Sequence, residues 1–172
     1  MASTHVYGEC GCGTPTGWVL PHCPSALVLS VDTSLDCVEH IPSANQDHPL
    51  RLEIQHIDSG LVGEFGAPVG YSKRVAFPLC TGWVWNRAIK LDVVSIDGRL
   101  RVCCFLAGLK HAFQGMRIVF DDYEREQYRI VEKYLKPVEQ SECQALFLVS
   151  STAVIDLSEL AHDLKAFRLI ID

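Results

Sequence analysis

Asp97-Gly98 stands between two apolar runs, IKLDVV at residues 89–94 and LRVCCFL at residues 100–106. An Asp-Gly pair in this setting is typical of a β-hairpin, because glycine accepts the positive φ that a tight turn needs. Strict alternation along the second run would place every second side chain, from Leu100 to Leu106, on one face. The stretch therefore predicts two antiparallel strands joined by a two-residue turn.

Short apolar runs elsewhere predict further strands, at residues 26–31, 50–56, 73–79, 82–85, 116–120, 145–149 and, as an edge strand, 168–171. Two stretches favour helices: residues 121–135, and residues 157–167 behind a capping box of Asp156 and Glu159. Because the strands do not alternate with helices, a doubly wound fold is disfavoured. We expect an α+β fold, with a mainly antiparallel curved sheet or partly open barrel and two helices in a single β-rich domain.

The 172-residue chain has the length of one domain. Residues 1–24 are rich in Gly, Pro and Cys, which predicts an irregular arm ahead of a single α+β domain over residues 25–172. No apolar run approaches the roughly 18 residues that would span a bilayer, and the N-terminus shows no secretory signal. We expect a soluble protein without a membrane partner, in the cytoplasm or another reducing compartment, with its eight cysteines mostly as buried thiols.

Charge is distributed unevenly along the chain. The net charge is −6, yet residues 73–117 hold eight Lys and Arg against two Asp. Aromatic residues are interleaved with these basic residues. Open β-faces that bind single-stranded nucleic acids combine basic residues with stacking aromatic side chains. The candidate binding residues are Lys73, Arg74, Trp83, Trp85, Arg87, Lys90, Arg99 and Arg101. The alternative is a surface neutralised by the acidic segments of the chain itself, with the aromatic residues in the core.

Four soft metal ligands lie close together near the N-terminus: Cys10, Cys12, His22 and Cys23. Zinc prefers four such ligands in a tetrahedron, so a zinc knuckle is one interpretation of the arm. The spacing is tighter than usual, and Cys37 or His40 could replace one ligand. The alternative is an irregular arm without metal. Zinc is the one cofactor that the sequence suggests.

Catalytic patterns are weak. Asp58-Ser59-Gly60 is similar to the active-site loop of retroviral-type aspartic proteases, but a tight turn explains the triplet better. Cys80 could act as a nucleophile with His56, His111 or His40 as its base, or be a half-buried thiol. We find no P-loop, no dinucleotide-binding glycine fingerprint and no nucleophile elbow, and we predict no catalytic residue.

Residues 18–22 (WVLPH) and 69–74 (VGYSKR) resemble the small β-barrel leader proteins of coronaviruses. That resemblance implies a viral host-interfering protein. The absence of a convergent catalytic set favours a non-enzymatic interaction or regulatory domain that binds a protein partner. A nucleic-acid-binding β-domain built on residues 73–117 and the leader-type protein are the alternatives, and an enzyme is disfavoured.

Overall fold

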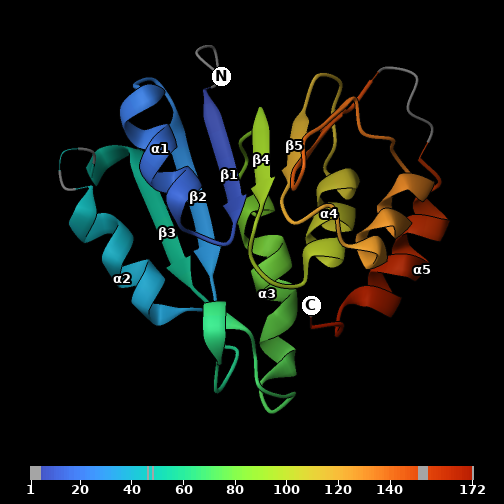
Figure 1. The fold of residues 1–172 in the computed structure, drawn as a ribbon, viewed down its shortest axis with the longest axis horizontal. Coiled ribbons are helices and arrows are strands. Elements are labelled where there is room, and N and C mark those ends of the chain that lie inside the picture. The colour runs from blue at the N-terminus through green and yellow to red at the C-terminus, as the bar shows by residue number, and fades with distance from the viewer. Residues whose placement is uncertain (1–4, 46, 48, 151–154, 172) are drawn as a thin grey trace.

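The computed structural model describes residues 5–45, 47, 49–150 and 155–171. Within them, seven strands form one sheet in the order β3-β2-β1-β4-β5-β7-β6 (Figure 1). The strands are β1 (Val6–Cys10), β2 (Leu27–Asp32), β3 (Leu52–His56), β4 (Val93–Ile96), β5 (Arg117–Phe120), β6 (Glu139–Gln140) and β7 (Ala145–Leu148). Strands β1 to β5 pair in parallel, and β7 runs antiparallel between β5 and β6.

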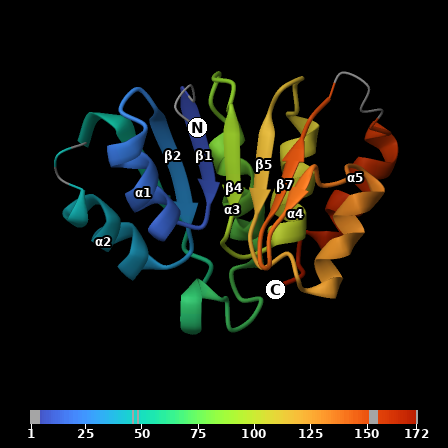
Figure 2. The same cartoon turned by 45° about the horizontal axis from the view of Figure 1, so that its top comes forward.

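Helices connect the parallel strands and lie on both faces of the sheet. They are α1 (Thr14–His22), α2 (Leu35–Ala44), α3 (Phe77–Gly82), α4 (Arg101–Lys110) and α5 (Leu157–Phe167), with 3-10 turns at Pro49–Arg51, Glu64–Gly66, Arg74–Ala76, Trp83–Trp85 and Glu126–Lys133. Figure 2 shows α1 and α2 on one face, beside β1 to β3, and α3 and α4 on the other. The arrangement is a doubly wound α/β sheet.

Side chains of the central strands point alternately to the two faces of the sheet, and a hydrophobic core lies on each face. Tyr7 of β1 packs with Val19 and Val28 under α1, whereas Cys10 and Val94 face the larger core that α3, α4 and α5 cover. Parallel strands covered on both faces read as continuous apolar runs. This explains the nearly continuous apolar run of β2, which is buried on both faces.

The predicted fold class is wrong, and so is the hairpin at its centre. Asp97-Gly98 joins β4 to helix α4, and residues 101–109 are all buried inside that helix. An apolar run that is buried on every side fits a strand or a helix equally well by periodicity alone. The sheet is mostly parallel and is neither a barrel nor an antiparallel meander.

Some of the other predicted helices and strands are confirmed by the structure, and others are wrong. The strands predicted at 26–31, 50–56, 116–120 and 145–149 are β2, β3, β5 and β7. Helix α5 is capped by Asp156, which accepts the N–H groups of Ser158 and Glu159. Residues 73–79 and 82–85 are helical turns instead of strands, 121–135 holds a 3-10 helix, and 168–171 forms no strand. The predicted irregular arm contains β1 and α1.

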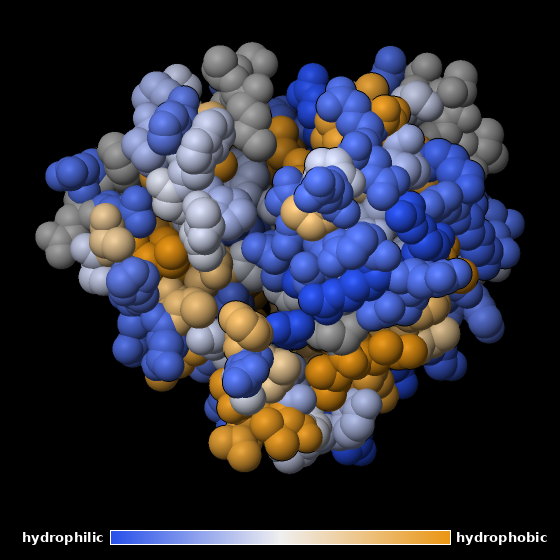
Figure 3. Space-filling model, viewed as in Figure 1, coloured by the Kyte–Doolittle hydropathy of each residue, from blue (hydrophilic) through white to orange (hydrophobic). Residues whose placement is uncertain are grey.

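The segment between β3 and α3 carries large apolar side chains in solvent, which form the orange area at the bottom of Figure 3. They include Leu61, Phe65, Val69 and Val75, and Leu79 of α3 is half-exposed as well. Over the described ranges, no helix is both long and apolar enough to cross a membrane.

Candidate functional site

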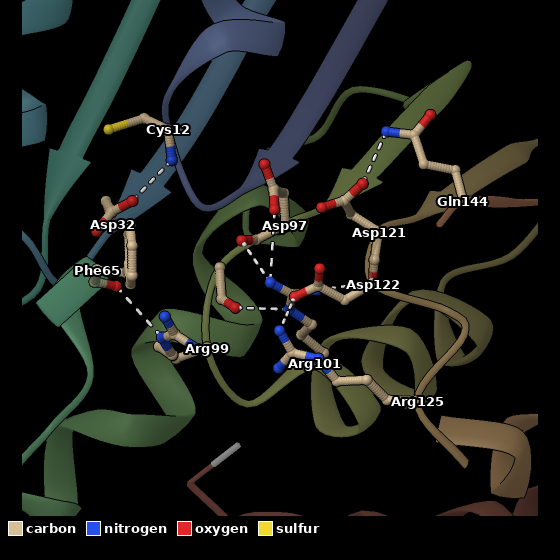
Figure 4. Close-up of polar contacts among 11 residues, drawn as sticks. Cys12, Asp32, Phe65, Asp97, Arg99, Arg101, Asp121, Asp122, Arg125 and Gln144 are labelled. Atoms are coloured by element: carbon tan, nitrogen blue, oxygen red, sulfur yellow. Dashed lines mark hydrogen bonds and ion pairs between the residues drawn. The ribbon is translucent and has the colours of Figure 1, made fainter. Parts of the chain in front are cut away.

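The strand order reverses between β1 and β4, and ligands of open α/β sheets bind at such a point, beyond the carboxyl ends of the strands. A cleft of about 340 Å³ lies there. Its walls come from the loops after four strands: Gly11 and Cys12 after β1, Asp32 at the end of β2, Asp97 to Arg99 after β4, and Asp121 and Asp122 after β5 (Figure 4).

Three glycines follow β1: Gly11 and Gly13 in the loop before α1, and Gly17 in the first turns of α1. Gly11 has φ +102°, and a β-carbon there would lie 2.8 Å from the carbonyl carbon of Asp97. Only glycine fits this position without displacing backbone. The pattern differs from the dinucleotide-binding fingerprint by one extra residue before the third glycine, so the sequence does not match that fingerprint.

Asp32 ends β2 and holds this glycine loop in place. Its Oδ2 accepts the N–H of Cys12 at 2.7 Å, and its Oδ1 accepts the N–H of Ser34 at 2.6 Å. An acidic residue about 20 positions after the first glycine binds ribose hydroxyls in dinucleotide-binding folds. Asp32 stands 21 positions after Gly11. The spacing of a strand end, a glycine loop and an acid was the signal that could have located this cleft.

Glu9 is fully buried beneath the same loop. Its carboxyl group accepts hydrogen bonds from the hydroxyls of Thr16, Ser30 and Tyr7, with the last two at 3.0 and 3.3 Å. Burial raises the pKa of Glu9 to about 8, against the lowering effect of the three hydroxyls. The bonds to Thr16 in α1 and Ser30 in β2 fix the start of α1 over the sheet.

Arg101 ties the loops after β4 and β5 together from inside α4. Its side chain is 4% exposed, and it donates to the carbonyl oxygens of Gly98 at 2.9 Å and Asp121 at 2.7 Å. Its Nη1 also lies 2.8 Å from Oδ2 of Asp122. A buried guanidinium in such a network fixes backbone geometry through several directed bonds at once.

Asp97 and Asp121 form a carboxyl pair in the wall of the cleft. Burial, and then the hydrogen bond and charge of Asp121, raise the pKa of Asp97 to about 7, while Arg101 acts in the opposite direction. Gln144 donates from Nε2 to Oδ1 of Asp121 at 2.8 Å. Because the pKa of Asp97 is near neutrality, its carboxyl group suits general acid–base chemistry.

Backbone strain concentrates around the cleft. In the described part of the chain, the non-glycine residues with positive φ are Phe65 at 54°, Leu100 at 60° and Asp122 at 55°. Phe65 and Asp122 line the cleft, and Leu100 lies between Arg99 and Arg101. Each such residue costs about 1–3 kcal/mol, and strain of this kind clusters at functional sites.

The structure separates the predicted zinc ligands. Cys10 and Cys12 lie at the carboxyl end of β1, whereas His22 and Cys23 lie at the far end of α1, a helix that spans about 13 Å. Among the described residues, no three or more His, Cys, Asp or Glu side chains could hold a metal ion together. The zinc prediction is therefore wrong.

The predicted binding residues do not form one surface. Arg99 and Arg101 lie at the cleft, while Trp85 is buried and stacks on His111. The Arg87 guanidinium lies over the Trp83 ring and pairs with Glu53. The remaining three, Lys73, Arg74 and Lys90, do not line the cleft, and binding of a protein or nucleic acid by the set stays a prediction.

The two catalytic patterns of the sequence lie outside the cleft. Asp58 forms an ion pair with Lys73 on the surface. Cys80 is buried, and burial raises the pKa of its thiol to about 12, which makes it a poor nucleophile.

No protein-family model matches the chain, and no curated protein sequence matches it. Solved structures are similar to it in fold. A methyltransferase-like protein from Silicibacter pomeroyi superposes with a TM-score of 0.78 at 25% sequence identity, over 97% of this chain and 88% of that one. A methyltransferase from Geobacter sulfurreducens gives a TM-score of 0.57 at 14% identity, over 87% and 73%. The N-methyltransferase NodS from Bradyrhizobium japonicum, in complex with S-adenosyl-L-homocysteine, gives 0.52 at 16%, over 84% and 78%.

These similarities give the chain the Rossmann-like α/β fold of methyltransferases. They overturn the interpretation as a non-enzymatic interaction or regulatory domain, and with it the nucleic-acid-binding β-domain and the leader-type β-barrel. The physical reason for the error is the misassigned region 73–106, where buried helices were taken for strands.

Proposed function

We propose that the chain is a methyltransferase that binds S-adenosylmethionine in the cleft at the carboxyl ends of β1, β2, β4 and β5. The observation that carries the proposal is the pairing of the Gly11 turn with Asp32 at the switch point of the sheet. The solved structure of NodS, which has the same fold, is a complex with S-adenosyl-L-homocysteine, the demethylated form of this cofactor.

The residues in the cleft fit such a ligand in kind. Asp32 can accept ribose hydroxyls, since each carboxylate oxygen can accept more than the one backbone N–H that it binds. Asp97, Asp121 and Asp122 offset the positive charge of a sulfonium and an ammonium group, and Arg99 and Arg125 can face the carboxylate at the same end. A volume of about 340 Å³ lies within the range of small-molecule sites.

S-adenosylmethionine supplies an electrophilic methyl carbon when bound. The protein has three tasks: to hold the cofactor against the glycine loop, to exclude water from the cleft and to receive a proton from the acceptor. Asp97 is placed for the third task, because it lines the cleft beside Asp121 and burial raises its pKa to about 7.

Calorimetric titration of the full chain with S-adenosylhomocysteine tests this function. We expect one site per chain, and about tenfold or greater weakening in Asp32→Asn, because hydrogen bonds to a charged acceptor contribute about 1.5–3 kcal/mol. Asp36→Asn is the matched control, since Asp36 is exposed on α2 and does not line the cleft. Wild-type protein without affinity for S-adenosylhomocysteine at about 1 mM would contradict the proposal.

We also propose that the protein works in the cytoplasm or another reducing compartment. Six of the eight cysteines are buried, five of them in the apolar cores, which is compatible with a reducing cytoplasm.

A further inference from the structure

We propose that a second cavity, on the α1 face of β4 and β5, binds the methyl acceptor, and that the acceptor is a neutral, mainly apolar small molecule with an O–H or N–H group. This inference rests on the proposed function. The cavity has a volume of about 400 Å³, and its lining includes Tyr7, Trp18, Ser95, Asp97, Val119 and Gln144.

Asp97 is the residue that connects the two cavities. It lines the cleft together with Gly11 and Cys12, and it lines the second cavity together with Ser95 and Gln144. Figure 4 shows Cys12 and Asp32 on one side of Asp97, and Asp121 and Gln144 on the other. A group bound in either cavity therefore meets the same carboxyl side chain.

The acceptor can reach this cavity because the sheet is open there. Figure 2 shows α3 behind β4 and α4 behind β5 and β7, and no helix in front of β5 and β7. Val119 on this face is only half-buried and Leu148 is 37% exposed, although Ile118 and Phe147 on the opposite face are fully buried. An apolar sheet face without a covering helix can hold a small apolar molecule.

The lining of the cavity selects the chemical class. Trp18, Val19 and Val119 offer apolar contact, whereas Ser95, Asp97 and Gln144 offer hydrogen bonds. None of the described residues that line it is Lys or Arg, in contrast to the cleft with Arg99, Arg101 and Arg125. An anionic acceptor would meet the carboxyl group of Asp97 with no cation in the lining of the cavity, so a neutral molecule is favoured.

Methylation of an O–H or N–H group forms one bond from oxygen or nitrogen to carbon and breaks one carbon–sulfur bond. The sulfur keeps that electron pair, and the acceptor loses one proton. Ionised Asp97 is the group that takes the proton, because it lines the cavity of the acceptor and, once protonated, can donate a hydrogen bond to Asp121. The atoms and charges of the transfer then balance without a further reactant.

Two-dimensional ¹H–¹⁵N NMR of the full chain, without any methyl donor, tests the acceptor site directly. The probes are phenol and aniline as neutral protic rings, and benzoate as the anionic counterpart. We expect phenol and aniline to shift the Trp18 indole N–H and the amides of Ser95, Val119 and Gln144, with benzoate at least tenfold weaker.

Val119→Phe, which fills the cavity, should reduce the phenol and aniline shifts at least fivefold, whereas Val138→Phe on an exposed loop should not. Thermal unfolding checks that Val119→Phe folds, and Trp18→Ala, at the half-exposed rim of the cavity, provides a second variant that is expected to weaken both probes.

Shifts that are absent from these four residues, or that persist in both variants, would overturn the acceptor site. If S-adenosylhomocysteine still binds in the same samples, the acceptor inference fails and the proposed function stands. If the cofactor does not bind at all, the proposed function itself fails.

Discussion

Gly98 lies directly against Gly11, so that a β-carbon on Gly98 would lie 2.8 Å from the Cα atom of Gly11. The N–H of Gly98 donates to the carbonyl oxygen of Cys10 at 2.6 Å. The loops after β1 and β4 are thus joined at the point where the strand order reverses. This contact forms the floor of the cleft, and both loops must keep it for the cleft to keep its shape.

Gly98→Ala should therefore destabilise the protein by about 1–3 kcal/mol, because the added methyl group must displace backbone on the opposite loop. It should also weaken binding of S-adenosylhomocysteine. Urea denaturation and calorimetry measure the two effects. Gly82→Ala is the control, since Gly82 does not line the cleft and a β-carbon there has no atom within 4 Å. Equal stability of the two variants would show that the contact is less tight than described.

Arg101 gives a second prediction. Arg101→Met removes a buried guanidinium and leaves the carbonyl oxygens of Gly98 and Asp121, and the carboxylate of Asp122, without its donors. Breaking a buried pair in this way costs about 3–5 kcal/mol. Arg87→Met removes a surface ion pair with Glu53 and should cost less than about 1 kcal/mol. Urea denaturation with losses of similar size for the two variants would contradict the central role of Arg101.

Glu9 makes the stability of the fold depend on pH. Its pKa is about 8 in the folded protein and about 4.5 in the unfolded chain, so the folded state binds more protons between these values. Stability from this group is fully present below pH 4.5 and is lost as the pH rises to about 8, with a slope of at most about 1.4 kcal/mol per pH unit. Glu9→Gln, which stays neutral, should remove this slope.

Urea denaturation between pH 5.5 and pH 8.5 compares the two proteins, and Glu9→Gln should be the more stable one at the alkaline end. Asp36→Asn, on the exposed side of α2, controls for loss of one negative charge. Parallel curves for wild type and Glu9→Gln would show that Glu9 is ionised in the fold at neutral pH.

The sequence predicts strands best where they are flanked by clear turns. Residues 26–31 and 50–56 were assigned correctly, because β-branched runs and a polar loop leave few alternatives. Residues 100–106 were not, since α4 is buried on all sides and so carries no polar stripe. If that helix is assigned as a strand, the sequence no longer shows alternating strands and helices, which is the pattern that indicates a parallel sheet.

The site was missed for a related reason. Gly11, Gly13 and Gly17 depart by one residue from the usual glycine pattern, and the cysteines on either side of Gly11 suggested a metal. The role of Asp32 depends on its pairing with the N–H of Cys12, and that of Arg101 on contacts with two loops. Such contacts link residues 20 positions apart, and periodicity does not report them.

Asp97 gives the prediction that bears most directly on mechanism. Its pKa of about 7 reflects burial first, then Asp121, with Arg101 opposing and Asp122 adding a smaller increase; Tyr7 and Glu9 of β1 also lie within electrostatic reach. A base must be ionised, so methyl transfer should rise with pH up to about 7 and then level off.

Titration of the Asp97 carboxyl carbon by ¹³C NMR checks the pKa of Asp97 without an acceptor. Asp121→Asn should lower the midpoint, because it removes a neighbouring negative charge, whereas Asp58→Asn on the surface should leave it unchanged. An Asp97 midpoint near its ordinary value of about 4 would mean that the carboxylate is ionised throughout, and the rise in activity with pH would then require another group.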